Sequence, residues 1–149
     1  MKKIITGFLI LTAAILTQAR IMRTWTYQEL YDQADLVVIA KPTSTQETTE
    51  KAVLPDLRPD VNALGLSTEF EISVVLKGDK SLKKVTLHHY RLANTKLYYI
   101  NGPILVSFDP TQDTRFLLFL HREADGRYSA VSGQTDPWFS VKKLEGGAQ

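Results

Sequence analysis

The sequence predicts a mainly β (α+β) domain: a small, partly open antiparallel barrel of five or six strands, with one short N-terminal helix plugging one end. Residues 36–40 and 116–120 are apolar throughout, which is typical of strands buried on both faces. Turn residues at 77–80 and 125–126 each separate two strand-like segments and predict two hairpins. Because neither hairpin contains a helical crossover, the sheet should be largely antiparallel.

The first residues predict a cleavable secretory signal peptide at residues 1–19, followed by a single domain at 20–149. Two lysines precede an apolar run over residues 4–16, and small residues then place the expected cleavage after Ala19. A membrane anchor is the alternative, but the run is shorter than the roughly 20 residues of a spanning helix. We therefore expect export to the periplasm or the medium, without stable membrane insertion after cleavage.

Composition excludes several classes of function. The chain has no cysteine, so disulfides, thiol nucleophiles, cysteine-ligated zinc and a lipid-modified cysteine are all excluded. Of its 18 basic residues, two lie in the expected signal peptide, which leaves 16 basic against 16 acidic residues in the domain. A domain without net charge gives no electrostatic reason to expect nucleic acid as a partner.

The predicted helix begins at Thr26. Thr26 and Glu29 have the spacing of a capping box, in which each side chain satisfies the backbone amide of the other residue. Trp25 before the cap can pack on Leu30 after it. The face expected to be buried consists of Tyr27, Leu30, Tyr31 and Ala34.

The first half of the domain predicts three strands and one long loop. The strand at 36–40 should end at Pro42, which has no amide to donate. Residues 44–67 are polar and contain prolines, so we expect a long loop, either a disordered insertion or a functional segment. Residues 68–76 alternate, with Phe70, Ile72, Val74 and Leu76 on the expected buried face, and residues 84–89 return from the turn.

The second half begins with an irregular segment at 91–114, in which residues 104–108 are expected to form a short strand. The buried strand at 116–120 follows. Asp125-Gly126 predicts a type I′ turn, which needs positive φ at both central residues. Residues 127–132 return from this turn, and 138–141 are expected to add a last short strand.

No motif for catalysis, metal binding or cofactor binding is present, so we predict no catalytic residues, no metal site and no cofactor. His88 and His89 are neighbours on a strand and must point to opposite faces. His89 shares the phase of the apolar residues and is expected at the edge of the core. A metal site that combines one of them with His121 is a weaker alternative to ordinary polar strand residues.

Aromatic residues in the irregular segments are the better candidates for function. Tyr98, Tyr99 and Trp138 are the candidate partner-binding residues, because large and half-polar rings are effective at interfaces. Tyr90 and Phe108 lie in similar positions, and all five rings could be displayed at a barrel mouth. The alternative is that these rings close the core beneath the loops.

Several structural motifs carry a resemblance to a known group of proteins. They are Gln33-Ala34-Asp35-Leu36-Val37-Val38, Val75-Leu76-Lys77-Gly78-Asp79, Phe116-Leu117-Leu118-Phe119-Leu120, Asp125-Gly126-Arg127-Tyr128 and Ser132-Gly133-Gln134. In this order the chain resembles small exported bacterial domains, which are similar to the barrel of tissue inhibitors of metalloproteinases and netrin modules. The resemblance covers about residues 26–141 and implies an oligonucleotide/oligosaccharide-binding (OB) type of fold.

The resemblance does not extend to the inhibitory residues. Those inhibitors use an N-terminal cysteine to chelate the zinc of the enzyme, whereas this chain has no cysteine and its expected mature start is Arg20. The leading hypothesis is a non-enzymatic exported module that binds a protein or a glycan through residues 44–67 and 91–114. The alternatives are a hydrolase or metal-dependent enzyme that uses His121 with nearby acids, and a structural component of the envelope.

Overall fold

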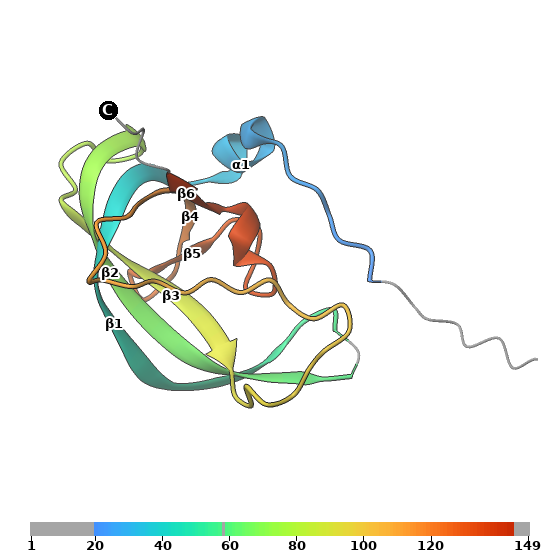
Figure 1. Ribbon diagram of the computed structural model, residues 1–149. Helices are drawn as coiled ribbons and strands as arrows, with labels where there is room; N and C mark the ends of the chain where they lie inside the picture. The colour runs from blue at the N-terminus through green and yellow to red at the C-terminus, as the bar shows by residue number, and fades with distance from the viewer. Residues whose placement is uncertain (1–19, 58, 145–149) are drawn as a thin grey trace, which may run out of the picture.

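The computed structural model describes residues 20–57 and 59–144, so the expected signal peptide and its cleavage site at Ala19 lie outside the described residues. One α-helix and six strands make up the fold (Figure 1). In chain order the elements are α1 (Tyr27–Gln33), β1 (Leu36–Leu54), β2 (Val61–Lys77), β3 (Lys84–Leu92), β4 (Arg115–Arg122), β5 (Tyr128–Ala130), the 3-10 helix η1 (Pro137–Phe139) and β6 (Val141–Leu144). No helix in the described ranges has the length and hydropathy of a membrane span.

Five of the strands form a ring in the order β1-β2-β3-β5-β4, which closes because β4 also pairs with β1. Strand β6 adds to β4 outside the ring. All pairings are antiparallel except β3 with β5, which are parallel and share the single pair Leu87↔Tyr128. The ring is therefore uneven and only partly closed, which confirms the prediction of a mainly β, partly open OB-like barrel with one short helix.

The interior of the ring is filled by alternate residues of the two apolar strands together with side chains from β2, β3 and the start of β6. Its buried members are Leu36, Val38, Ala40, Phe70, Val85, Leu87, Leu118, Leu120 and Val141. The intervening residues Val37 and Phe119 are also buried, but on the outer face of the ring. The predicted burial of 36–40 and 116–120 on both faces is thus confirmed in its main features.

Helix α1 begins where the capping box predicts. The Thr26 amide donates to Glu29 Oε2 at 2.8 Å, and the Glu29 amide donates to Thr26 Oγ1 at 3.2 Å. These two bonds satisfy amides that a helix N-terminus otherwise leaves without partners. The amide and hydroxyl of Thr26 also stabilise the ionised Glu29 carboxylate and hold the pKa of Glu29 below its usual value.

The helix does not plug an end of the barrel, so this part of the prediction is wrong. Leu30 and Ala34 pack on Val37, Phe119 and Val131, on the outer face of β1 and β4. The buried stripe is also narrower than expected, because Tyr27 and Tyr31 are 62% and 39% exposed. A helix of two turns laid on the outside of a sheet contacts it through only a few side chains.

The predicted loop at 44–67 is wrong as well, because β1 continues to Leu54 and β2 begins at Val61. Together residues 44–54 and 61–69 form a long hairpin, which we call the ribbon (Figure 1), and β3 pairs along the other edge of β2 from Ala63 to Glu71. Residues 44–52 of β1 are exposed or half-buried and carry no apolar stripe, so the sequence does not reveal this strand, although Val61 and Ala63 of β2 are buried. Pro42 is tolerated because β1 stops pairing with β4 after Ala40, so its missing amide removes no bond on that side.

Strand β2 changes its phase, which corrects the predicted face of residues 68–76. Phe70 is fully buried and Ile72 half-buried, but Val74 and Leu76 are exposed, and Val75 packs against the core instead. The cause lies in the register, since β2 gains an unpaired residue opposite Val37/Val38 and another opposite Ile39/Ala40. Each extra residue turns the following side chains to the other face.

Three smaller predictions are also corrected. Residues 104–108 form no strand, and Trp138 lies in η1 rather than in the last strand, which is β6. At the β4–β5 turn only Gly126 has positive φ. Its amide donates to Glu123 O at 3.1 Å, so the loop has three residues and a glycine bulge instead of the two-residue type I′ turn.

Burial on the outer face can be tested through Phe119, which is 3% exposed and packs beneath α1. We expect Phe119→Ala to lower the free energy of unfolding by about 3–5 kcal/mol, since it removes a packed aromatic ring and leaves a cavity. Denaturant unfolding measures this change. Tyr98→Ala, at a ring that is 91% exposed, is the control and should change stability by less than about 0.5 kcal/mol. Equal midpoints for the two variants would contradict the packing described.

Candidate functional site

The two adjacent histidines of β3 have different environments. His89 points into the ring, where it is 1% exposed, shares a 2.8 Å hydrogen bond with Thr68 Oγ1 and lies edge-on to the Phe108 ring. Burial lowers the pKa of His89 to about 4, so the ring is neutral near neutral pH. This confirms His89 as a core histidine. It has no freedom to reach a ligand at the surface.

His88 points outward but is almost completely covered by acidic side chains. Its Nδ1 lies 3.0 Å from Glu123 Oε2, and its Nε2 lies 3.5 Å from Glu50 Oε2. The ring also packs on Tyr90, with 4.9 Å between the centroids. His88 therefore occupies the centre of a polar network between the ribbon and the β4–β5 turn.

Arg127 completes this network with the strongest contacts in it. Its Nη1 and Nη2 donate to the two carboxylate oxygens of Glu50 at 2.9 and 2.7 Å, and its Nε donates to Asp125 Oδ2 at 2.7 Å. The paired geometry matches a guanidinium to a carboxylate. The hydrogen bonds from Arg127, followed by one from the Thr48 side chain, lower the pKa of Glu50 to about 2. The pair joins β1 to the β4–β5 turn across the outer face of β3.

A bulge in β1 places Glu50 in this position. The register passes from Glu47↔Leu66 to Lys51↔Leu64, so three residues of β1 lie opposite Gly65 alone. A Cβ on Gly65 would lie 2.9 Å from Glu50 Cβ, closer than real side chains approach. An isolated glycine in a strand is a sequence signal for such a bulge, and it could have revealed this one. No pattern of neighbouring residues in the sequence predicts the pairing of Glu50 with Arg127.

His121 lies elsewhere, at the end of β4. Its Nδ1 is 3.4 Å from Asp35 Oδ2, and the same carboxylate oxygen accepts from the Arg122 amide at 2.9 Å. Both side chains are exposed, and no hydroxyl is hydrogen-bonded to His121 among the described residues. Residues 20–57 and 59–144 also contain no group of three or more histidine, aspartate or glutamate side chains arranged to hold a metal ion.

The structure places the three candidate partner-binding residues in two different regions. Tyr98 is 91% exposed in the connection between β3 and β4, with Leu97 and Ile100 beside it at 52% and 78%; we call these three residues the loop tip. Tyr99 packs inward on the buried cluster of the ribbon end. Trp138 is half-exposed in η1, where Lys142 Nζ lies 4.2 Å from its ring centroid.

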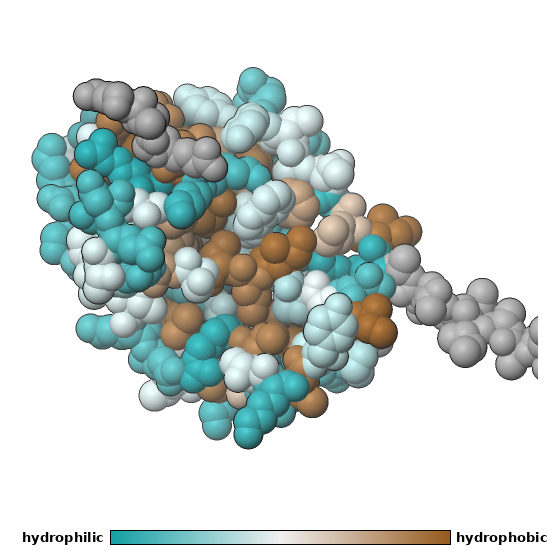
Figure 2. Space-filling model, viewed as in Figure 1, coloured by the Kyte–Doolittle hydropathy of each residue, from teal (hydrophilic) through white to brown (hydrophobic). Residues whose placement is uncertain are grey.

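The loop tip is held on an ordered base. Tyr99 contacts a cluster at the ribbon end that contains the buried residues Leu54, Leu57, Val61 and Ala63. The Gly102 amide donates to Tyr99 O at 3.2 Å, and Asn101 has φ +56°, which together close a turn. Figure 2 shows that the apolar surface on this side of the molecule is divided into separate patches among hydrophilic side chains.

The buried imidazole of His89 predicts a dependence of stability on pH. Between the unfolded pKa of about 6.5 and the folded pKa of about 4, the unfolded chain binds the proton and the folded protein does not, so acid favours unfolding. We expect the protein to lose about 3 kcal/mol of stability over this window. His89→Gln keeps a hydrogen-bonding group but does not titrate. Unfolding curves of this variant should therefore lose about 3 kcal/mol less stability over the same pH window than those of the parent protein. An unchanged pH profile in the variant would contradict this account.

The bulge can be tested separately with Gly65→Ala. The added methyl group should displace Thr48 and Glu50 and weaken the pair with Arg127. We expect the pKa of Glu50, followed by NMR of its carboxyl carbon, to rise from about 2 toward the ordinary glutamate value of 4.5. The pKa of Glu69 in β2, which is lowered by Lys84 of β3, is the internal control. A Glu50 carboxyl that still titrates near 2 would show that the bulge does not depend on Gly65.

Comparison with known proteins finds no family model and no curated protein that matches this chain. Its candidate sites are therefore defined by the geometry of their own side chains: a polar network around His88, an exposed His121–Asp35 pair, and the apolar loop tip.

Proposed function

We propose that this protein is an exported, non-enzymatic interaction module that binds a protein partner through the loop tip. The observation that carries the proposal is the exposure of Leu97, Tyr98 and Ile100, three large apolar side chains within four residues of one connection. Exposed apolar groups gathered in this way are typical of interaction sites. A tyrosine flanked by aliphatic residues is also the composition of an interface anchor.

The base of the loop supports the same proposal. Because Tyr99 is packed on the ribbon end and the following turn is closed by a hydrogen bond, little conformational entropy remains to be lost when a partner binds. A protein pocket can bury such side chains fully, whereas a glycan offers too little apolar surface to cover three of them. This favours a protein over a glycan at the loop tip.

Export is part of the proposal and rests on the pattern of residues 1–19, with cleavage after Ala19. A contact made by Arg20, the expected first residue after cleavage, supports this proposal. Arg20 Nη2 donates to Asp136 Oδ1 at 2.6 Å, with both side chains mostly buried. The same carboxylate oxygen accepts from the Ile104 amide at 3.1 Å, so Arg20 is tied to the segment that leads from the loop tip.

A crosslinking experiment tests the loop tip. We expect a photo-crosslinking amino acid at Tyr98 to yield a discrete adduct in the native envelope, and one at Gln46, exposed on the ribbon, to yield none. The adduct partner, once purified, should bind the double variant Leu97→Ser/Ile100→Ser at least about tenfold more weakly, as expected for central interface anchors. Val53→Ser, at an apolar residue that is 55% exposed on the ribbon, is the matched control and should bind normally. Equal binding by both variants would contradict the proposal.

A further inference from the structure

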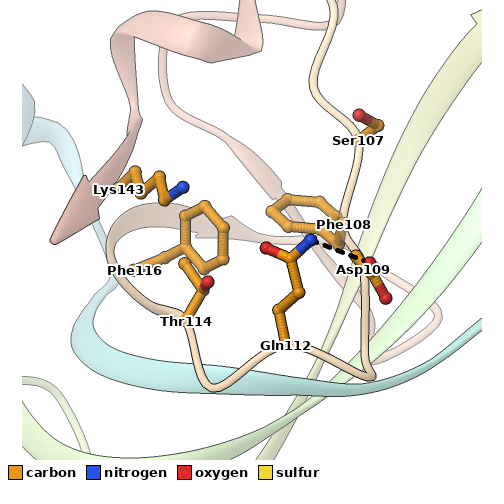
Figure 3. A pocket seen from close by; sticks show the side chains of 7 residues that line it. All are labelled: Ser107, Phe108, Asp109, Gln112, Thr114, Phe116 and Lys143. Carbon is orange, nitrogen blue, oxygen red and sulfur yellow. Dashed lines mark hydrogen bonds between the residues drawn. The ribbon is translucent and has the colours of Figure 1, made fainter. Parts of the chain in front are cut away.

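A pocket opens at the end of the barrel where β4 begins, away from the loop tip. It has a volume of about 250 Å³ and is lined by Ser107, Phe108, Asp109, Gln112, Thr114, Phe116 and Lys143 (Figure 3). These residues come from the β3–β4 connection, the start of β4 and the end of β6. From its lining we propose that this pocket binds one ring of a neutral carbohydrate.

The floor of the pocket is aromatic and rigid. Phe108 and Phe116 lie edge to face with 5.1 Å between their centroids, and both rest on the fully buried Phe70, at 4.9 and 6.3 Å. Each of the two rings is half-buried, so part of it remains available at the pocket. A sugar ring presents C–H groups on its faces, and these can cover aromatic surface that is otherwise in contact with water.

The rim of the pocket is polar and preorganised. Asp109 accepts from the Thr111 hydroxyl at 2.6 Å, from the Thr111 amide at 2.9 Å and from Gln112 Nε2 at 3.0 Å. The Thr111 hydroxyl in particular holds the pKa of Asp109 below its usual value. The bond to Asp109 fixes the Gln112 amide, and its carbonyl oxygen then points across the pocket toward Phe116 (Figure 3).

Lys143 supplies donors on the opposite side. Its ammonium has no hydrogen-bond or ion-pair partner among the described residues, and its side chain extends over Phe116 into the pocket (Figure 3). It is the direct cross-strand partner of Phe116, whereas the preceding Lys142 is paired with Leu117 and stacks on Trp138. Neighbouring residues of a strand point to opposite faces, so only one of these two lysines serves the pocket.

The chemistry of the lining selects among ligand classes. A purely apolar ligand would strip water from the amide, hydroxyl and charged groups without replacing their hydrogen bonds. A polyanion would meet the Asp109 carboxylate opposite a single lysine. A neutral polyol ring suits both the aromatic floor and the polar rim, because its faces are apolar and its hydroxyls donate and accept hydrogen bonds. The volume is below the roughly 300–1,000 Å³ of most small-molecule sites, so one ring fits and its neighbours remain in solvent.

This site does not coincide with the position where OB barrels commonly bind ligands, which is the face of the second and third strands and the loops beside it. Here the polar network of His88, Glu50 and Arg127 covers that side of β3. The pocket at the start of β4, which we call the mouth pocket, is therefore a separate site on the barrel. It is also independent of the proposed protein partner, because it shares no residue with Leu97, Tyr98 and Ile100.

An NMR titration tests the inference with maltohexaose, cellohexaose and chitohexaose as probes. We expect at least one of them to shift amides of residues 107–116 and 143, with a dissociation constant on the order of 1 mM or tighter, as suits a ligand that buries a single ring. Gln112→Ala and Lys143→Ala should each weaken this binding at least about fivefold. Lys142→Ala makes the same charge change on the opposite face and should leave it unchanged. All three positions lie at the surface, so the variants should fold.

Three outcomes would overturn the inference. They are the absence of amide shifts with every probe up to about 10 mM, equal weakening by Lys142→Ala and Lys143→Ala, and binding of a heparin hexasaccharide in place of the neutral probes. The variant Leu97→Ser/Ile100→Ser should bind the sugar normally. Loss of sugar binding in that variant would place the ligand at the loop tip instead, so failure of this site and failure of the proposed function can be told apart.

Discussion

Strand β1 pairs with β2 over almost its whole length but with β4 only from Leu36 to Ala40, and the rest of the structure depends on where these two pairings separate. Before that point β1 and β4 form a barrel wall that is buried on both faces, with β2 along the other edge of β1. Beyond it β1 and β2 run on as the ribbon, in which β2 also pairs with β3. On the β4 side the separation leaves Phe116 and Thr114 at an open end of the barrel, where the mouth pocket forms. One divergence therefore produces both the ribbon and the pocket.

The open seam of the barrel is reinforced by charge rather than by a covalent bond. β3 and β5 share one backbone pair, and the Glu50–Arg127 pair spans the same side of the molecule. In a chain without cysteine this is a long-range tie between segments that lie far apart in the sequence. Glu50 is partly exposed, so salt should weaken the tie.

The sequence was informative where the structure depends on neighbouring residues. The capping box at Thr26 and Glu29 and the two apolar strands follow from local patterns, and the structure has them where predicted. The ribbon could not be predicted in this way, because its β1 strand is polar and the apolar residues at its end pack on Tyr90, Leu92 and Tyr99 from other segments. The phase change in β2 depends on register against β1, and the mouth pocket requires residues from three separate segments. Tertiary pairing decided each of these features.

The pairing of Leu36 with Leu120 joins the beginning of the domain to a strand near its end. Such a contact cannot form until most of the chain is available, and closing so long a loop is slow compared with making a helix or a hairpin. For a protein that crosses a membrane before it folds, this delay is useful. On the proposed export route, a barrel that cannot close without its C-terminal strands would keep the chain in a form that a translocation channel can still accept.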